Sequence, residues 1–85
     1  MTNEEIKNIV LTCIAEVAPG TDVSGLVDAG PLRCQLNLDS MDFLDLVMDL
    51  RKHYQIEIPQ KDFPQITSMN DFIDYLRPKL AQLAA

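Results

Sequence analysis

Apolar residues recur at helical spacing from the start of the chain. They follow the capping-box pattern "TNEE", in which Thr2 is the N-cap and Glu5 stands three residues on. The stripe consists of Ile6, Ile9, Val10, Cys13, Ile14 and Val17. The "APG" at 18–20 interrupts it, so the pattern predicts a helix over residues 3–17.

A second helix is expected over residues 40–54, with Asp39 as its N-cap and Asp42 three residues on. On a helical wheel, five of its apolar residues fall within about 80° of one another. They are Phe43, Leu46, Val47, Leu50 and Tyr54. This arc is the expected core face.

The same helix carries a second apolar arc, formed by Met41, Leu44 and Met48. Asp45 lies beside this arc, and Asp42 and Asp49 lie further round the helix. Either the helix is covered on all sides, or the second arc is an exposed stripe that binds other proteins. Methionine suits a surface that accepts several partners because its side chain is flexible.

The last helix is expected to start near Ser68, where "SMND" supplies an N-cap and an acid at N3. Its apolar stripe contains Met69, Phe72, Ile73, Leu76, Leu80 and Leu83. Pro78 falls inside the stripe and should end or kink the helix near Arg77, although a frayed continuation is an alternative.

Residues 18–38 form a long connection that holds all three glycines, and its apolar residues predict packing against the helices. "QIEIP" at 55–59 alternates like a strand but has no second strand to pair with, so it is interpreted as a loop. Residues 59–63 can form one short helical turn. The predicted fold is all-α: a single domain over 1–85, with three main helices, one short helix and a long loop between the first two main helices.

The composition and the net charge of the chain limit the kinds of partner that it can bind. With 47% hydrophobic residues the chain is globular, and its net charge of −6 disfavours nucleic acid and anionic membrane surfaces. The same charge favours protein partners with basic patches. There is no apolar run near the roughly 20 residues of a membrane span and no basic segment of a signal peptide at the start. Cys13 fits a buried, reduced thiol, and we expect a cytoplasmic monomer.

Catalytic and metal motifs are absent from the sequence. His53 is the only histidine, and it stands at a helix end with no serine or cysteine partner that the sequence identifies. The acids lack the alternating spacing and the glycine of an EF-hand loop. The chain is therefore not expected to be an enzyme or to hold a metal at a high-affinity site, and loose binding of divalent ions by the clustered acids stays open. Ser40 is either a surface residue at a helix start or a working group, since a helix N-terminus favours an anion.

Three segments together resemble an acyl carrier protein: "LNLDSMDFLDLVMDL", then "IEIP", then "ITSMNDFIDYL". The signature of that family is Asp-Ser-Leu at the start of the second helix, and here it reads Asp39-Ser40-Met41. The resemblance extends from about Pro31 to Leu76. It implies that 4′-phosphopantetheine, taken from coenzyme A by a phosphopantetheinyl transferase, is attached covalently to Ser40. The thiol of this arm would carry acyl groups as thioesters to enzymes of fatty acid, lipid or polyketide-type biosynthesis.

The resemblance also assigns roles to other positions. Residues expected to bind partner enzymes are Asp39, Met41, Asp42, Leu44, Asp45, Met48, Asp49, Arg51 and Lys52. Residues expected to form the core and to shelter an acyl chain are Phe43, Leu46, Val47, Leu50, Phe72, Ile73 and Leu76.

Some positions depart from the family pattern. Met41 replaces the commoner leucine, and Asn37 stands where the family usually has glycine, a position that asparagine tolerates in a left-handed conformation. Arg51 and Lys52 stand where carriers of fatty acid synthesis are usually acidic, and Arg33 adds a cation ahead of the motif. Partner enzymes with basic docking residues would meet like charge there. The hypothesis is a specialised carrier that serves a dedicated pathway.

Two alternatives stay open. One is a carrier for an amino acid or another activated acid, which would use the same serine and arm. The other is a helical protein-interaction domain whose serine is never modified, for which Ser40→Ala would leave partner binding intact.

Overall fold

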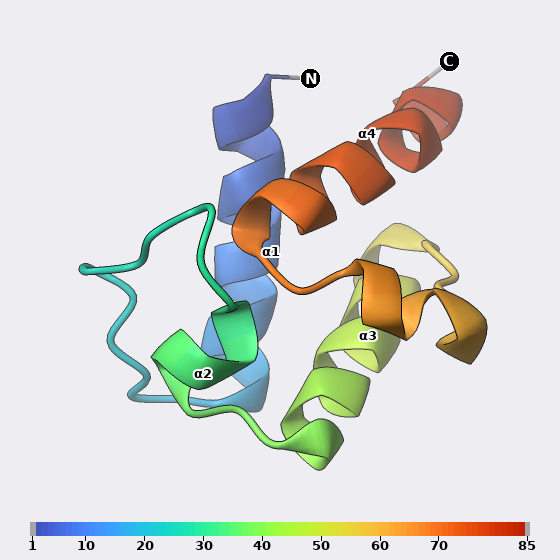
Figure 1. The fold of residues 1–85 in the computed structure, drawn as a ribbon. Coiled ribbons are helices and arrows are strands. Elements are labelled where there is room, and N and C mark those ends of the chain that lie inside the picture. Colours follow the sequence, from blue (N-terminus) through green and yellow to red (C-terminus); the bar gives the residue numbers. More distant parts are fainter. Residues whose placement is uncertain (1, 85) are drawn as a thin grey trace.

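A computed structural model describes residues 2–84, and the side chains of residues 2–82. Three long helices, α1 (Asn3–Val17), α3 (Ser40–Tyr54) and α4 (Met69–Ala84), form the bundle (Figure 1). Two short elements join them: the α-helix α2 (Leu32–Leu36) and the 3-10 helix η1 (Gln60–Gln65). No strand occurs within residues 2–84, which confirms the all-α prediction and the loop at 55–59.

The helix bounds follow the caps that the sequence predicts. At α1 the Thr2 hydroxyl accepts from the Glu5 N–H at 3.2 Å, and the Glu5 carboxylate accepts from Thr2 in return. At α4 the Ser68 hydroxyl accepts from the Asp71 N–H at 3.1 Å. Each cap satisfies backbone donors that would otherwise lack a partner, so the predicted starts are confirmed.

Of the outcomes that the sequence leaves open at Pro78, the structure has the continuation: α4 runs through Pro78 to Ala84 and does not end near Arg77. Pro78 is exposed, whereas Leu76 and Leu80 are buried on the opposite side. A proline inside a helix removes one backbone hydrogen bond. Burial of the apolar stripe on both sides of the proline offsets this loss.

The core lies where α1 packs against α3 and α4. Phe43 of α3 is buried in this core, with its ring 5.1 Å from the Phe63 ring and 5.9 Å from the Phe72 ring. The predicted core residues of α3 and α4 are all buried: Phe43, Leu46, Val47, Leu50, Phe72, Ile73 and Leu76. Tyr54, predicted on the same face, is half-buried.

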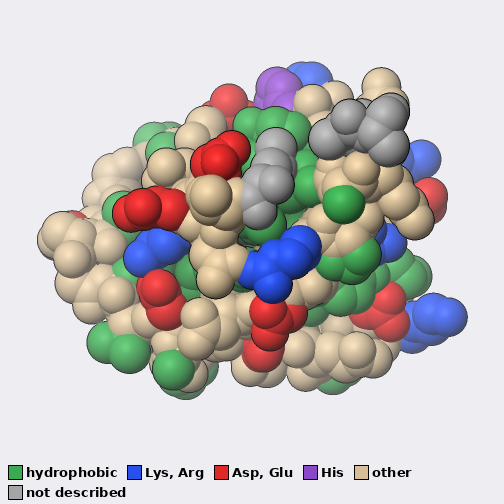
Figure 2. All heavy atoms as spheres, turned by 90° about the horizontal axis from the view of Figure 1, so that it is seen from above, with side chains coloured by type: hydrophobic (Ala, Val, Ile, Leu, Met, Phe, Trp, Pro, Cys, Tyr) green, Lys and Arg blue, Asp and Glu red, His purple; other side chains and the backbone are tan. Residues whose placement is uncertain are grey.

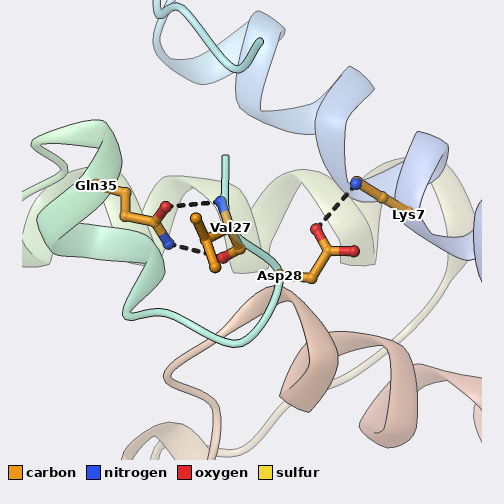
Figure 3. Close-up of polar contacts among 4 residues, drawn as sticks. All are labelled: Lys7, Val27, Asp28 and Gln35. Atoms are coloured by element: carbon orange, nitrogen blue, oxygen red, sulfur yellow. Dashed lines mark hydrogen bonds and ion pairs between the residues drawn. The ribbon is translucent and has the colours of Figure 1, made fainter. Parts of the chain in front are cut away.

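The long first loop is held against the bundle by polar contacts. The Gln35 side-chain amide of α2 accepts from the Val27 N–H at 2.8 Å and donates to the Val27 carbonyl at 2.9 Å (Figure 3). Next to it, Lys7 of α1 pairs with Asp28 at 2.9 Å. The Leu32 N–H donates to the Thr67 carbonyl at 2.7 Å, which fixes α2 beside the start of α4. The loop thus has a defined path, and it places α2 next to the first turn of α3.

Candidate functional site at the start of α3

Ser40 is the first residue of α3, at the end of the molecule opposite the two termini (Figure 1). Asp39 takes the capping role: its Oδ1 accepts from the Asp42 N–H at 2.8 Å, and Asp42 Oδ2 accepts from the Asp39 N–H at 3.3 Å. The Ser40 side chain is exposed and takes no part in this cap. The predicted cap at Asp39 is confirmed, and it leaves the Ser40 hydroxyl outside the cap.

Asn37 sets the direction from which the chain enters α3. Its backbone is left-handed, with φ 54° and ψ 42°, as expected for an asparagine that replaces glycine. Its N–H donates to the Arg33 carbonyl and closes α2. Two residues later the chain reaches the Asp39 cap, so this turn brings α2 and the first residue of α3 together.

Arg33 reaches from α2 to the serine. Its Nη2 donates to Ser40 Oγ at 3.0 Å, and its guanidinium carbon lies 5.9 Å from the centre of the Phe43 ring. The sequence shows Arg33 only as a cation ahead of the motif. The contact depends on the placement of α2, a five-residue helix without a side-chain cap that the sequence pattern does not locate.

A groove of about 820 Å³ opens beside Ser40. Its walls come from α2, from the first turns of α3 and from η1, and they include Met41, Phe43, Leu44 and Phe63. The walls are mainly apolar, and among the described residues that line them Arg33 alone has a formal charge. An exposed hydroxyl, a cation and an apolar groove therefore meet at one end of the bundle.

The second apolar arc of α3 is largely exposed. Met41 is 65% exposed and Met48 59%, Leu44 is half-buried, and Asp45 between them is exposed. Met41 and Met48 are two of the three large hydrophobic side chains that the described part of the chain leaves most exposed. Of the two interpretations that the sequence allows, the structure agrees with the exposed stripe, and the binding of other proteins to it stays a prediction.

Comparison with known proteins gives the family. Residues 8–76, most of the chain, match the family model described as "Phosphopantetheine attachment site". The chain is 36% identical over 75 residues to the acyl carrier protein of Brachyspira hyodysenteriae, covering 86% of this chain and 88% of that protein. It is 32% identical over 79 residues to the acyl carrier protein of Thermotoga maritima, covering 93% and 96%.

The chain belongs to the acyl carrier protein family. It is a carrier and not an enzyme, its cofactor is covalently bound 4′-phosphopantetheine, and it interacts with a phosphopantetheinyl transferase and with acyl-handling enzymes. The start of α3 suits this cofactor. The exposed Ser40 hydroxyl offers an ester oxygen, Arg33 offers a positive charge to a phosphate, and the groove offers apolar walls to the arm.

The other residues predicted to contact partners of the carrier differ in how exposed they are. Arg51 and Lys52, in the last turn of α3, are exposed, and neither has a carboxylate within 4.0 Å in the described part of the chain. The Asp49 side chain is only 13% exposed, and its Oδ1 lies 3.2 Å from His53 Nε2. Asp49 also neighbours the Cys13 thiol of α1, so it lies largely away from solvent, and its role in partner binding stays a prediction.

His53 joins α3 to α1. Its Nε2 lies 3.1 Å from Glu16 Oε2 of α1, in addition to its contact with Asp49. Donor atoms of these three residues lie within 4.8 Å of one another, so they are the metal-compatible group among the described residues.

Burial, and then the neighbouring Asp49 carboxylate, raise the pKa of the Cys13 thiol to about 12. Cys13 thus stays protonated, in agreement with the predicted buried thiol.

No helix among the described residues is long and apolar enough to cross a membrane.

Proposed function

We propose that Ser40 is the residue to which 4′-phosphopantetheine is attached, and that the arm presents acyl groups as thioesters to biosynthetic enzymes. The observation that supports Ser40 most strongly is that a different residue caps α3. Asp39 caps the helix, which leaves the Ser40 hydroxyl exposed beside a cation. A phosphate on this oxygen would also gain from the partial positive charge of the helix N-terminus.

We assign separate roles to the groove and to the exposed arc of α3. The groove of about 820 Å³ suits the arm and the first part of an acyl chain. The buried residues of α3 and α4 behind Phe43 are the proposed shelter for the rest of that chain. Met41, Leu44, Asp45 and Met48 form the proposed docking surface, because an apolar stripe with a carboxylate fits enzymes that have basic docking patches.

The pathway is proposed to be a dedicated one, outside housekeeping fatty acid synthesis. Arg51 and Lys52 are exposed and have no carboxylate partner among the described residues, so their charge is available to a partner enzyme. A basic docking patch would be repelled at this end of α3, whereas a partner with acidic residues there would be attracted. Work in the cytoplasm is also proposed, because both cysteines are free thiols.

The attachment is tested by intact mass spectrometry after incubation with coenzyme A and a broad-specificity phosphopantetheinyl transferase. The expected result is a gain of one phosphopantetheine by the wild type and by Ser24→Ala, and no gain by Ser40→Ala. Ser24 is a matched control because it is an exposed serine in the first loop. A Ser40→Ala protein that is still modified would overturn the assignment. A wild type that gains nothing would favour an unmodified interaction domain.

A further inference from the structure

Arg33 has two positioned contacts although it lies at the surface. An exposed arginine normally keeps many rotamers, and fixing its side chain costs conformational entropy. Here the guanidinium donates to Ser40 Oγ at 3.0 Å and lies 5.9 Å from the Phe43 ring centre, within reach of a cation–π interaction. These contacts hold the charge at the hydroxyl where the proposed attachment takes place.

The charge of Arg33 is also available to a ligand. No carboxylate lies within 4.0 Å of it among the described residues, although the chain has a net charge of −6. The carboxylates nearest in sequence to Ser40 hold each other in the cap, where Asp39 and Asp42 exchange hydrogen bonds. Only one of the five N–H donors of the guanidinium is used on Ser40 Oγ.

Attachment of the arm adds a negative charge at an acidic position. A phosphodiester on Ser40 stands between Asp39 and Asp42 in sequence, and Asp45 follows one turn later. Like charges repel, and the groove beside the serine has a single charged lining residue to compensate. That residue is Arg33, whose forked donors match two phosphate oxygens at once.

We propose that Arg33 is the positioning residue of the prosthetic group, resting on the proposed attachment at Ser40. Before attachment it holds the hydroxyl. After attachment its free N–H groups bind the non-bridging oxygens of the phosphodiester, which are bonded to the phosphorus that Oγ then carries. Through this ion pair Arg33 directs the start of the arm along the groove, whose wall it shares with Phe43.

A thermodynamic cycle tests the proposal. Wild type, Arg33→Gln and Arg77→Gln are prepared without the arm and, by transferase treatment, with it, and the melting temperature of each form is measured. Arg77 is a matched control because it is an exposed arginine on α4. Arg33→Gln should lower the melting temperature of the loaded form by about 2–5 °C more than that of the unloaded form. Arg77→Gln should affect both forms equally, and 0.5 M salt should shrink the difference at Arg33.

Phosphorus NMR of the loaded proteins gives a second readout that a purely structural role would not change. The phosphodiester resonance of Arg33→Gln should differ from that of the wild type, and Arg77→Gln should match the wild type. Equal stability losses in both forms of Arg33→Gln, together with an unchanged resonance, would overturn the role of Arg33 and leave the attachment at Ser40 standing. A wild type that takes up no arm, as judged by mass, would overturn the attachment and this inference together.

Discussion

At the scale of single residues, two non-glycine positions within residues 2–84 hold a left-handed backbone. Asn37 has φ 54° and ends α2, and Gln55 has φ 56° and ends α3. The Gln55 N–H donates to the Arg51 carbonyl at 3.0 Å, so the strained residue closes the helix. Asparagine accepts this conformation through its short polar side chain, whereas glutamine has no such help.

Gln55→Gly is therefore expected to stabilise the protein by about 0.5–1 kcal/mol, because glycine adopts the left-handed conformation without a clash. Urea unfolding measures the change. Gln65→Gly is the matched control, since Gln65 is exposed and has no positive φ. It should be neutral or destabilising. A Gln55→Gly protein that loses as much stability as Gln65→Gly would show that the left-handed backbone carries no strain.

Tyr75 provides a pH-dependent contact between α4 and η1. Its hydroxyl donates to Asp62 Oδ2 at 2.6 Å, and burial together with this hydrogen bond raises the pKa of Tyr75 to about 12. A raised pKa in the folded state means that the stabilisation is complete below pH 10, the ordinary value. It is lost as the pH rises towards 12.

The stability advantage of the wild type over Tyr75→Phe should accordingly shrink as the pH rises from about 10 towards 12. Urea unfolding at a series of pH values measures it, and Cys13, which titrates in the same range, cancels because both proteins contain it. Tyr54→Phe is the control that keeps the hydrogen bond to Asp62. An advantage that stays constant with pH would show that this hydrogen bond does not contribute.

At the scale of elements, the bundle depends on how the long loop is attached. Gln35 contacts both the N–H and the carbonyl of Val27, which requires a side chain with both a donor and an acceptor (Figure 3). A side chain on Gly30 would meet the Gln35 amide, because a Cβ there would lie 2.9 Å from Gln35 Nε2. The glycine thus leaves room for the contact that holds α2 in place.

Gln35→Glu is expected to destabilise the protein by about 1–2 kcal/mol. The carboxylate still accepts from the Val27 N–H, but it cannot donate to the Val27 carbonyl. Its negative charge also repels the carbonyl oxygen. Chemical unfolding measures the loss, and Gln82→Glu, an exposed change of the same chemistry on α4, is the control. Equal effects of the two changes would contradict the anchoring role of Gln35.

The elements also show how far the sequence predicts this fold. The bounds 3–17 and 40–54 agree with α1 and α3, because apolar periodicity and a capping box act together at both helices. The five residues of α2 have no side-chain cap and depend on contacts with Val27 and Thr67, which are distant in sequence. The Arg33–Ser40 contact was unpredictable for the same reason. Ser40 as the candidate for attachment follows from the sequence alone, because its motif is local.

At the scale of the whole molecule, the proposed site lies at the end opposite the termini (Figure 1). On the face that carries the termini, acidic and basic side chains are interspersed (Figure 2). Along α3, by contrast, Asp42 and Asp45 follow the serine, and Arg51 and Lys52 occupy the last turn. A partner that docks along α3 would meet opposite charges at the two ends of the helix, and we expect this to favour one direction of docking.

Exchange of Arg51 and Lys52 for glutamate should raise the use of the loaded carrier by general fatty-acid-synthesis enzymes by about tenfold, through faster association with their basic patches. The quantity to measure is kcat/KM for acyl loading at low and high salt. Arg77→Glu with Lys79→Glu is the control, because it changes the net charge equally on α4. If general fatty-acid-synthesis enzymes use the wild type efficiently, and the exchange leaves this kcat/KM unchanged, the hypothesis of a specialised carrier is contradicted.

The most direct test of the central claim is to locate the arm by peptide mass spectrometry. Cleavage after arginine releases Cys34–Arg51 as one peptide, in which Ser40 is the only side-chain hydroxyl. With Cys34 alkylated beforehand, the protein treated with coenzyme A and transferase should show one phosphopantetheine on this peptide, with fragment ions that place it on Ser40. An arm on any other peptide, or none on any peptide, would contradict the account.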